Sequence, residues 1–126
     1  MSIRTFKIDV EIYHYSFYVC IGNVKESLVF INELNGLPNE KEVGYKFKDL
    51  NNYAGGVFSN KGKPTILWLP KIPRTSEELS NLSHEIFHIV CHITRWVTLP
   101  LSITSEEAYC YLIGWMTKQF WLELKK

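Results

Sequence analysis

The segment from Thr75 to Arg95 carries the strongest structural pattern in the chain. Thr75 and Glu78 have the spacing of a helix capping box, in which each side chain accepts a hydrogen bond from a backbone N–H at the start of a helix. Apolar residues then follow at 86, 87, 89, 90 and 93, which leaves little polar surface, as in a helix surrounded by protein. We therefore predict a helix from about Ser76 to Arg95.

The remaining elements are predicted from their own local patterns. Alternating apolar residues favour a strand within 6–12, and a second strand is expected at 13–21. Helical spacing and the Asn35-Gly36 stop signal favour a helix at 24–34. Apolar runs at 53–59 and 65–69 flank a turn-forming cluster and predict a hairpin, whereas 39–52 is ambiguous. Thr104-Ser105-Glu106-Glu107 repeats the capping pattern and opens a last helix to about Glu123.

Length and composition limit the class of protein. With 126 residues, 46% of them hydrophobic, the chain fits one domain of the α+β class, 1–126, with a small antiparallel or mixed sheet. A formal charge of +1 gives no support for a nucleic-acid or membrane partner. Three cysteines without CxxC spacing, together with no signal-peptide pattern and no apolar run long enough to span a bilayer, lead us to expect a cytoplasmic protein.

Three residues of the predicted central helix have the spacing of a metal site. His84 and His88 are four residues apart, so their imidazoles leave one face of a helix and can hold one zinc ion. Glu85 lies beside the first histidine, where its carboxylate can reach a water on the metal; this is the HExxH arrangement. The alternative is that all three are ordinary core or surface residues. We favour zinc, because these polar groups are costly on an apolar helix without partners.

A catalytic zinc ion needs a third protein ligand. His92 continues the histidine stripe, but a straight helix cannot bring it to the same ion, so we interpret it as a supporting or structural residue. Glu106 and Glu107 at the start of the last helix are the next candidates, because the intervening chain is long enough to turn back beside the first helix. The spacing alone leaves both open.

The segments His84-Glu85-Ile86-Phe87-His88 and Glu107-Ala108-Tyr109-Cys110 together resemble the gluzincin family of thermolysin-like peptidases, which have HExxH and a downstream glutamate in an ExxA helix. The chain is also similar to small zincin-like proteins of phages and mobile elements, over residues 53–115. Cys110 stands where ExxA has alanine. The resemblance implies a minimal zincin-like fold, a Zn2+ cofactor, and Glu107 as third ligand.

The resemblance further implies a metallopeptidase, a hydrolase in which zinc activates a water and Glu85 is the general base for cleavage of a peptide or protein substrate. Tyr109, Tyr111, His92 and Arg95 are candidates for an oxyanion donor, and nothing selects among them. The strand at 66–69 resembles the zincin strand on which peptides pair, although an ordinary core strand is about equally expected. The competing function is a non-catalytic zinc-binding module that binds a protein partner.

Overall fold

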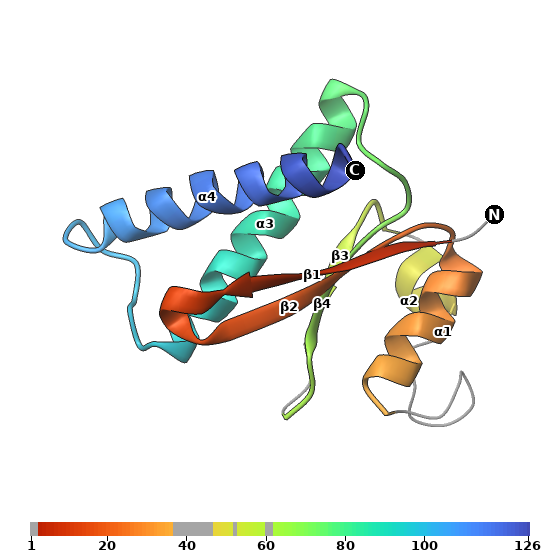
Figure 1. Ribbon diagram of the computed structural model, residues 1–126, viewed down its shortest axis with the longest axis horizontal. Coiled ribbons are helices and arrows are strands. Elements are labelled where there is room, and N and C mark those ends of the chain that lie inside the picture. The colour runs from red at the N-terminus through yellow and green to blue at the C-terminus, as the bar shows by residue number, and fades with distance from the viewer. Residues whose placement is uncertain (1–2, 37–46, 52, 60–61) are drawn as a thin grey trace.

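The computed structural model describes residues 3–36, 47–51, 53–59 and 62–126, and in this part the chain forms a mixed four-stranded sheet (Figure 1). Strands β1 (Arg4–Val10) and β2 (Tyr15–Ile21) are antiparallel and are joined by the short 3-10 helix η1 (Glu11–Tyr13). Strand β4 (Thr65–Leu69) runs parallel to β2, and β3 (Gly56–Phe58) pairs antiparallel with β4. The strand order is β1-β2-β4-β3, which confirms the predicted α+β class and the mixed sheet.

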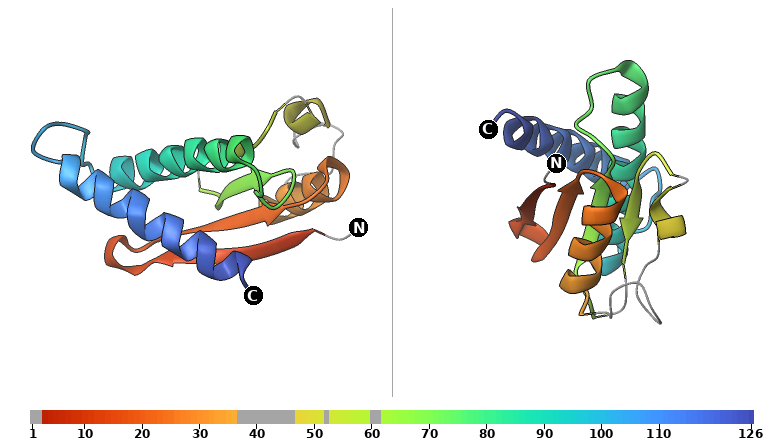
Figure 2. Two further views of the ribbon diagram at one scale, coloured as in Figure 1. Left: turned by 90° about the horizontal axis from the view of Figure 1, so that it is seen from above. Right: turned by 90° about the vertical axis from the view of Figure 1, so that its right-hand side faces the viewer.

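Helices cover both faces of this sheet (Figure 2). On one face lie α1 (Val24–Leu34) and the short α2 (Phe47–Asn51), and on the other lie α3 (Ser76–Trp96) and α4 (Glu106–Leu124). Helix α2 falls in the ambiguous part of the sequence, 39–52, of which residues 39–46 and 52 lie outside the described residues. Strand β3 is shorter than the predicted 53–59, and Asn60 and Lys61 of the predicted turn are also outside the description.

The alternation of side chains in β4 explains why it lies inside the sheet. Leu67 and Leu69 pack toward α3 and α4, whereas Ile66 and Trp68 pack toward α1. All five residues of β4 are buried, as expected of a strand with both faces covered. Because β2 and β3 pair with its two sides, β4 cannot accept a peptide, so of the two alternatives for 66–69 the ordinary core strand is confirmed and the exposed edge is wrong. The edge strand of this half of the sheet is β3.

Helix α3 begins with the predicted capping box. Thr75 Oγ1 accepts a hydrogen bond from the Glu78 backbone N–H at 3.2 Å, and Glu78 Oε1 accepts one from the Thr75 N–H at 3.2 Å. The apolar composition of this helix suggested that protein surrounds it on all sides. The structure shows that this is not so. Ile86, Ile89 and Ile93 are buried against the sheet and α4, whereas Phe87 is 41% exposed. One face of α3 is therefore free to carry polar groups.

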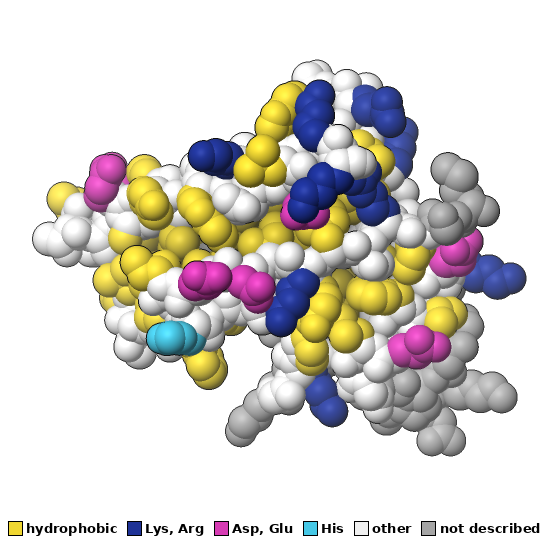
Figure 3. Space-filling model, in the orientation of Figure 1, with side chains coloured by type: hydrophobic (Ala, Val, Ile, Leu, Met, Phe, Trp, Pro, Cys, Tyr) yellow, Lys and Arg dark blue, Asp and Glu magenta, His cyan; other side chains and the backbone are white. Residues whose placement is uncertain are grey.

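Helix α4 begins one residue later than the capping pattern at Thr104 predicts. Ser105 is the residue before the helix, and its hydroxyl donates to the Pro100 carbonyl at 2.6 Å instead of capping a helical N–H. The connector thus uses this hydroxyl for its own turn. Of the α4 aromatics, Tyr109 and Phe120 are core residues, whereas Tyr111 and Trp121 are exposed. Figure 3 shows hydrophobic side chains on the surface along α4.

Membrane insertion through a helix has no support in the described residues. Helices α3 and α4 are long enough to cross a bilayer, but neither is apolar enough to do so.

Candidate metal centre

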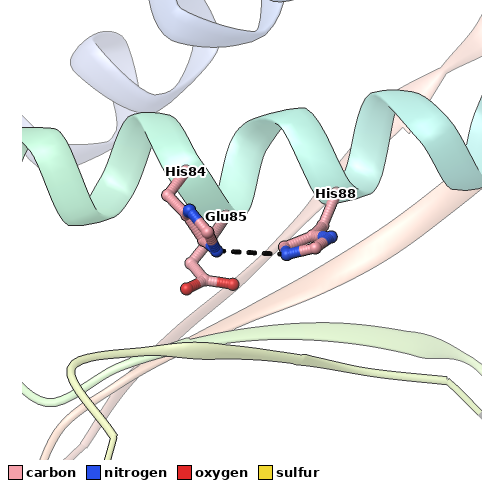
Figure 4. Close-up of side chains that lie close together, drawn as sticks. All are labelled: His84, Glu85 and His88. Carbon is pink, nitrogen blue, oxygen red and sulfur yellow. Dashed lines mark hydrogen bonds between the residues drawn. The ribbon is translucent and has the colours of Figure 1, made fainter.

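The regular geometry of α3 brings His84 and His88 together on its exposed face. Their side chains lie one helical turn apart, and the Nε2 atoms of the two rings are 3.2 Å from each other (Figure 4). Both side chains are exposed, so their nitrogens are accessible from solvent. At this distance the two imidazole nitrogens can share a metal ion or a proton.

The spacing of these nitrogens fits a zinc ion. Two Zn–N bonds of about 2.0–2.1 Å at a tetrahedral angle place the nitrogens about 3.3–3.4 Å apart, close to the separation that α3 imposes. Imidazole nitrogens are also ligands that zinc prefers. The donor atoms and their distance therefore suit zinc without a change in the helix backbone.

Glu85 completes the group from a buried position. Its side chain is only 7% exposed, and its carboxylate and the two imidazole nitrogens all lie within 4.8 Å of one another. Burial raises the pKa of the Glu85 carboxyl above its ordinary value, and the nearby His84 and His88 act in the opposite direction. Figure 4 shows the three side chains pointing from α3 toward the β3–β4 hairpin.

Gly55, which sequence reasoning missed, allows the chain to pass close to Glu85. A Cβ atom at position 55 would lie 3.3 Å from Glu85 Cγ and 3.2 Å from the carbonyl oxygen of Trp68. A side chain would therefore press on the Cγ methylene of Glu85 and on the β4 backbone together. The Gly55-Gly56 pair was the available signal, because glycine inside a strand pattern often marks a close approach of another group.

Glu107 and Glu106 lie in the first turn of α4 and are both exposed. Neither belongs to the group formed by His84, Glu85 and His88 among the described residues. The Tyr109 hydroxyl donates to the Leu99 carbonyl at 2.8 Å, which ties this turn to the connector after α3 rather than to the middle of the helix. In Figure 4 the grouped side chains point away from α4. Glu107 as third ligand stays a prediction.

The four candidate oxyanion donors lie on α3 and α4. His92 is half-buried one turn after His88, and its Nδ1 lies 3.5 Å from Arg95 Nη2. Burial lowers the pKa of His92 below its ordinary value, and Arg95 and His88 add to this. Tyr109 already uses its hydroxyl in the bond to Leu99, so it is the least suited of the four candidate oxyanion donors.

Comparison of the chain with protein-family models, with curated proteins and with solved structures finds no match. The structure accordingly shows a group that can bind a metal ion, with HExxH spacing on a helix, and leaves the identity of the metal open. The likeness to zincins rests on these residues alone.

Proposed function

We propose that the protein is a zinc-dependent metallopeptidase of the zincin type. The observation that carries this proposal is the 3.2 Å separation of the His84 and His88 Nε2 atoms, with the Glu85 carboxylate beside them. Structural zinc sites have four protein ligands, whereas catalytic sites keep a position open. A pair of accessible histidines next to a buried carboxylate favours the catalytic kind.

In this mechanism, zinc would polarise the carbonyl of the cleaved amide and lower the pKa of a water molecule. Glu85 takes a proton from that water as its oxygen attacks the carbonyl carbon. The same carboxyl then gives the proton to the departing amine as the C–N bond breaks. Burial raises the pKa of the Glu85 carboxyl in the metal-free protein, the direction that suits a base. Water is consumed, and a carboxylic acid and an amine are released.

The edge strand β3 supports an extended peptide as the substrate. It pairs with β4 on one side only, and Gly55, directly before it, lies against Glu85. A peptide added to this edge would form main-chain hydrogen bonds while its carbonyl groups pass the metal centre. This role falls to β3 rather than to the strand at 66–69 that the sequence suggested.

A non-catalytic zinc-binding module is the second candidate. The described residues place only His84, Glu85 and His88 close enough together to share an ion. If Glu85 itself binds the metal, the protein has a zinc site but no general base. Such a protein would use its surface to bind a protein partner.

The deciding experiment is a peptide-library cleavage assay with zinc-loaded protein and its Glu85→Gln variant. We expect cleavage by the parent and a loss of about 10²–10⁴-fold in the variant, with zinc retained, because the amide keeps the size of the side chain but is not a base. Glu77→Gln, in the exposed first turn of α3, is the matched control and should cleave as the parent does. Loss of zinc from Glu85→Gln would instead support the binding module.

A further inference from the structure

A cleft of about 560 Å³ lies at the C-terminal end of α3. The last turns of α3 form one wall with His92, Arg95 and Trp96, the start of β2 contributes Tyr15, and the chain entering β4 contributes Lys63 and Thr65. His92 is one turn beyond His88, so the cleft opens on the same helix face as the histidine pair.

The charged groups of the cleft are cations. Lys63 and Arg95 line it, and no aspartate or glutamate does so among the residues that the structure describes. Nor does either cation form an ion pair with any described residue. Arg95 Nη2 lies 3.5 Å from His92 Nδ1, and burial lowers the pKa of His92, which favours the neutral ring. Among the described residues, therefore, no carboxylate neutralises the positive charge that lines this cleft.

Hydroxyl groups and an aromatic pair complete the walls. The Tyr15 hydroxyl and Thr65 Oγ1 are 2.8 Å apart, and Ser59 Oγ lies 3.3 Å from the same threonine oxygen. Hydroxyls in such a row can each turn a proton toward an oxygen anion. The Trp96 ring meets Tyr15 edge-on at 6.4 Å between ring centres, which gives the cleft an apolar side.

A second basic cleft of the molecule shows why this one is favoured. It is lined by Arg4, Lys71 and Arg74 near the start of α3, but Glu78 also lines it. The Lys71 ammonium is 2.7 Å from a carboxylate oxygen of Glu78, and that carboxylate also accepts from the Arg74 backbone. Of the three cations there, Lys71 is thus paired with the carboxylate of the capping box, and Arg4 donates to the Glu123 carbonyl.

We propose that the cleft beside Arg95 binds an anionic group, a carboxylate or a phosphoryl group, on the peptide that the metal centre cleaves. Arg95 lies about two turns after His88, or about 10 Å along the helix axis. An extended peptide covers that distance with about three residues at ~3.3 Å each. The anion thus lies about three residues from the cleaved bond. This inference rests on the proposed peptidase function for the substrate, but the cleft itself can be tested without metal.

The test is a titration of isotope-labelled, metal-free protein, followed by NMR at the Arg95 side-chain and Trp96 indole N–H signals. The probes are inorganic phosphate, acetyl-trialanine with a free carboxylate, and the same peptide as its amide. We expect the anions to shift both signals and the amide not to. The indole of Trp121, exposed on α4, should stay unchanged. If only phosphate shifts the two signals, the cleft binds a phosphoryl group. If only the free peptide acid shifts them, it binds a carboxylate.

Variants make the assignment specific. Arg95→Gln and Lys63→Gln should each weaken anion binding at least about tenfold, a loss of about 1.4 kcal/mol. Lys118→Gln, an exposed charge on α4, is the control and should bind as the parent does. Equal shifts with the peptide acid and its amide, or undiminished binding by both cleft variants with native circular dichroism, would overturn the proposal.

These outcomes are separate from failure of the peptidase proposal. If the protein cleaves no peptide but still binds anions at Arg95, the proposed anion site stands and the proposed peptidase function is wrong. A protein that cleaves peptides without any response at Arg95 or Trp96 would keep the proposed function and lose the anion site.

Discussion

His84 and His88 face each other across one turn of α3, with their Nε2 atoms 3.2 Å apart. Without a metal, one neutral ring can donate its proton to the other, and this bond alone would hold the pair. With zinc, both nitrogens turn their lone pairs to the ion at nearly the same separation. Metal binding therefore requires a change of tautomer but little movement of the rings.

The first prediction concerns metal content. Protein purified without chelator should carry about one zinc per chain, because two helical histidines and a carboxylate match the ligands that zinc prefers. His84→Ala or His88→Ala should lose that zinc, as measured by elemental analysis. His14→Asn is the control, since asparagine tolerates the left-handed conformation of His14 (φ 51°). A parent protein that stays free of transition metal after zinc is supplied would contradict the site.

The arrangement of these two histidines could be predicted from sequence because it depends on one helix. The capping box at Thr75 and Glu78 and the apolar spacing fix where α3 begins, and four-residue spacing then fixes which side chains share a face. The strands and the other long helices were also predictable from local periodicity. Their existence follows from neighbouring residues, although β3 is shorter than the predicted 53–59 and α4 begins one residue later than its capping pattern predicts.

Relationships between distant segments could not be predicted in this way. The approach of Gly55 to Glu85 depends on how β3 pairs with β4, and the exposure of Phe87 depends on which side of α3 the helix α4 covers. At Ser105, local capping preference lost to a hydrogen bond with Pro100 in the connector. The first two outcomes are decided by tertiary packing, on which a local pattern carries no information, whereas the third is decided by a turn of the connector itself.

The second prediction addresses the third ligand. If Glu107 binds the metal, Glu107→Ala should cut zinc affinity severely in a calorimetric titration. Glu106→Ala is the matched variant, and it should cost at most about 1 kcal/mol of stability through lost interaction with the helix dipole. A larger affinity loss from Glu106→Ala would reverse the assignment. If both variants bind zinc as tightly as the parent, neither glutamate is a ligand. That outcome would agree with the structure, in which the group of possible ligands among the described residues contains His84, Glu85 and His88 only.

The third prediction tests the close approach at Gly55. Gly55→Ala should destabilise the protein by about 1–3 kcal/mol in urea unfolding, because the methyl group would press on Trp68 O and Glu85 Cγ. Hydrolysis should fall further than this loss of stability explains, since the base is displaced, while zinc stays bound. Gly114→Ala, in α4, is the control: apart from the helix's own backbone, its methyl group would meet nothing within 4 Å, and it should stabilise the helix by about 0.5–1 kcal/mol. Equal effects of both substitutions would contradict the packing argument.

The fourth prediction concerns the acid stability of α3. The Lys71 ammonium and the backbone N–H groups of Arg74 and Thr75 lower the pKa of Glu78 from its ordinary 4.5 to about 2. A carboxyl whose pKa is lower in the folded state contributes stability above the unfolded value and loses it as the pH falls toward the folded one. The contribution of Glu78 should therefore be complete above about pH 4.5 and decline between that pH and about 2.

Glu78→Gln removes this dependence, because glutamine keeps the capping geometry but carries no charge for Lys71. Thermal unfolding of the parent and the variant, measured from pH 7 down to pH 3, should show the parent as the more stable at neutral pH. The difference should narrow below about pH 4.5 as the unfolded parent takes up a proton. Glu77→Gln, from the same first turn, lacks the bond to Lys71 and should give a smaller difference. If the difference in stability between the parent and Glu78→Gln stays constant over this pH range, the charge at position 78 does not stabilise the start of α3.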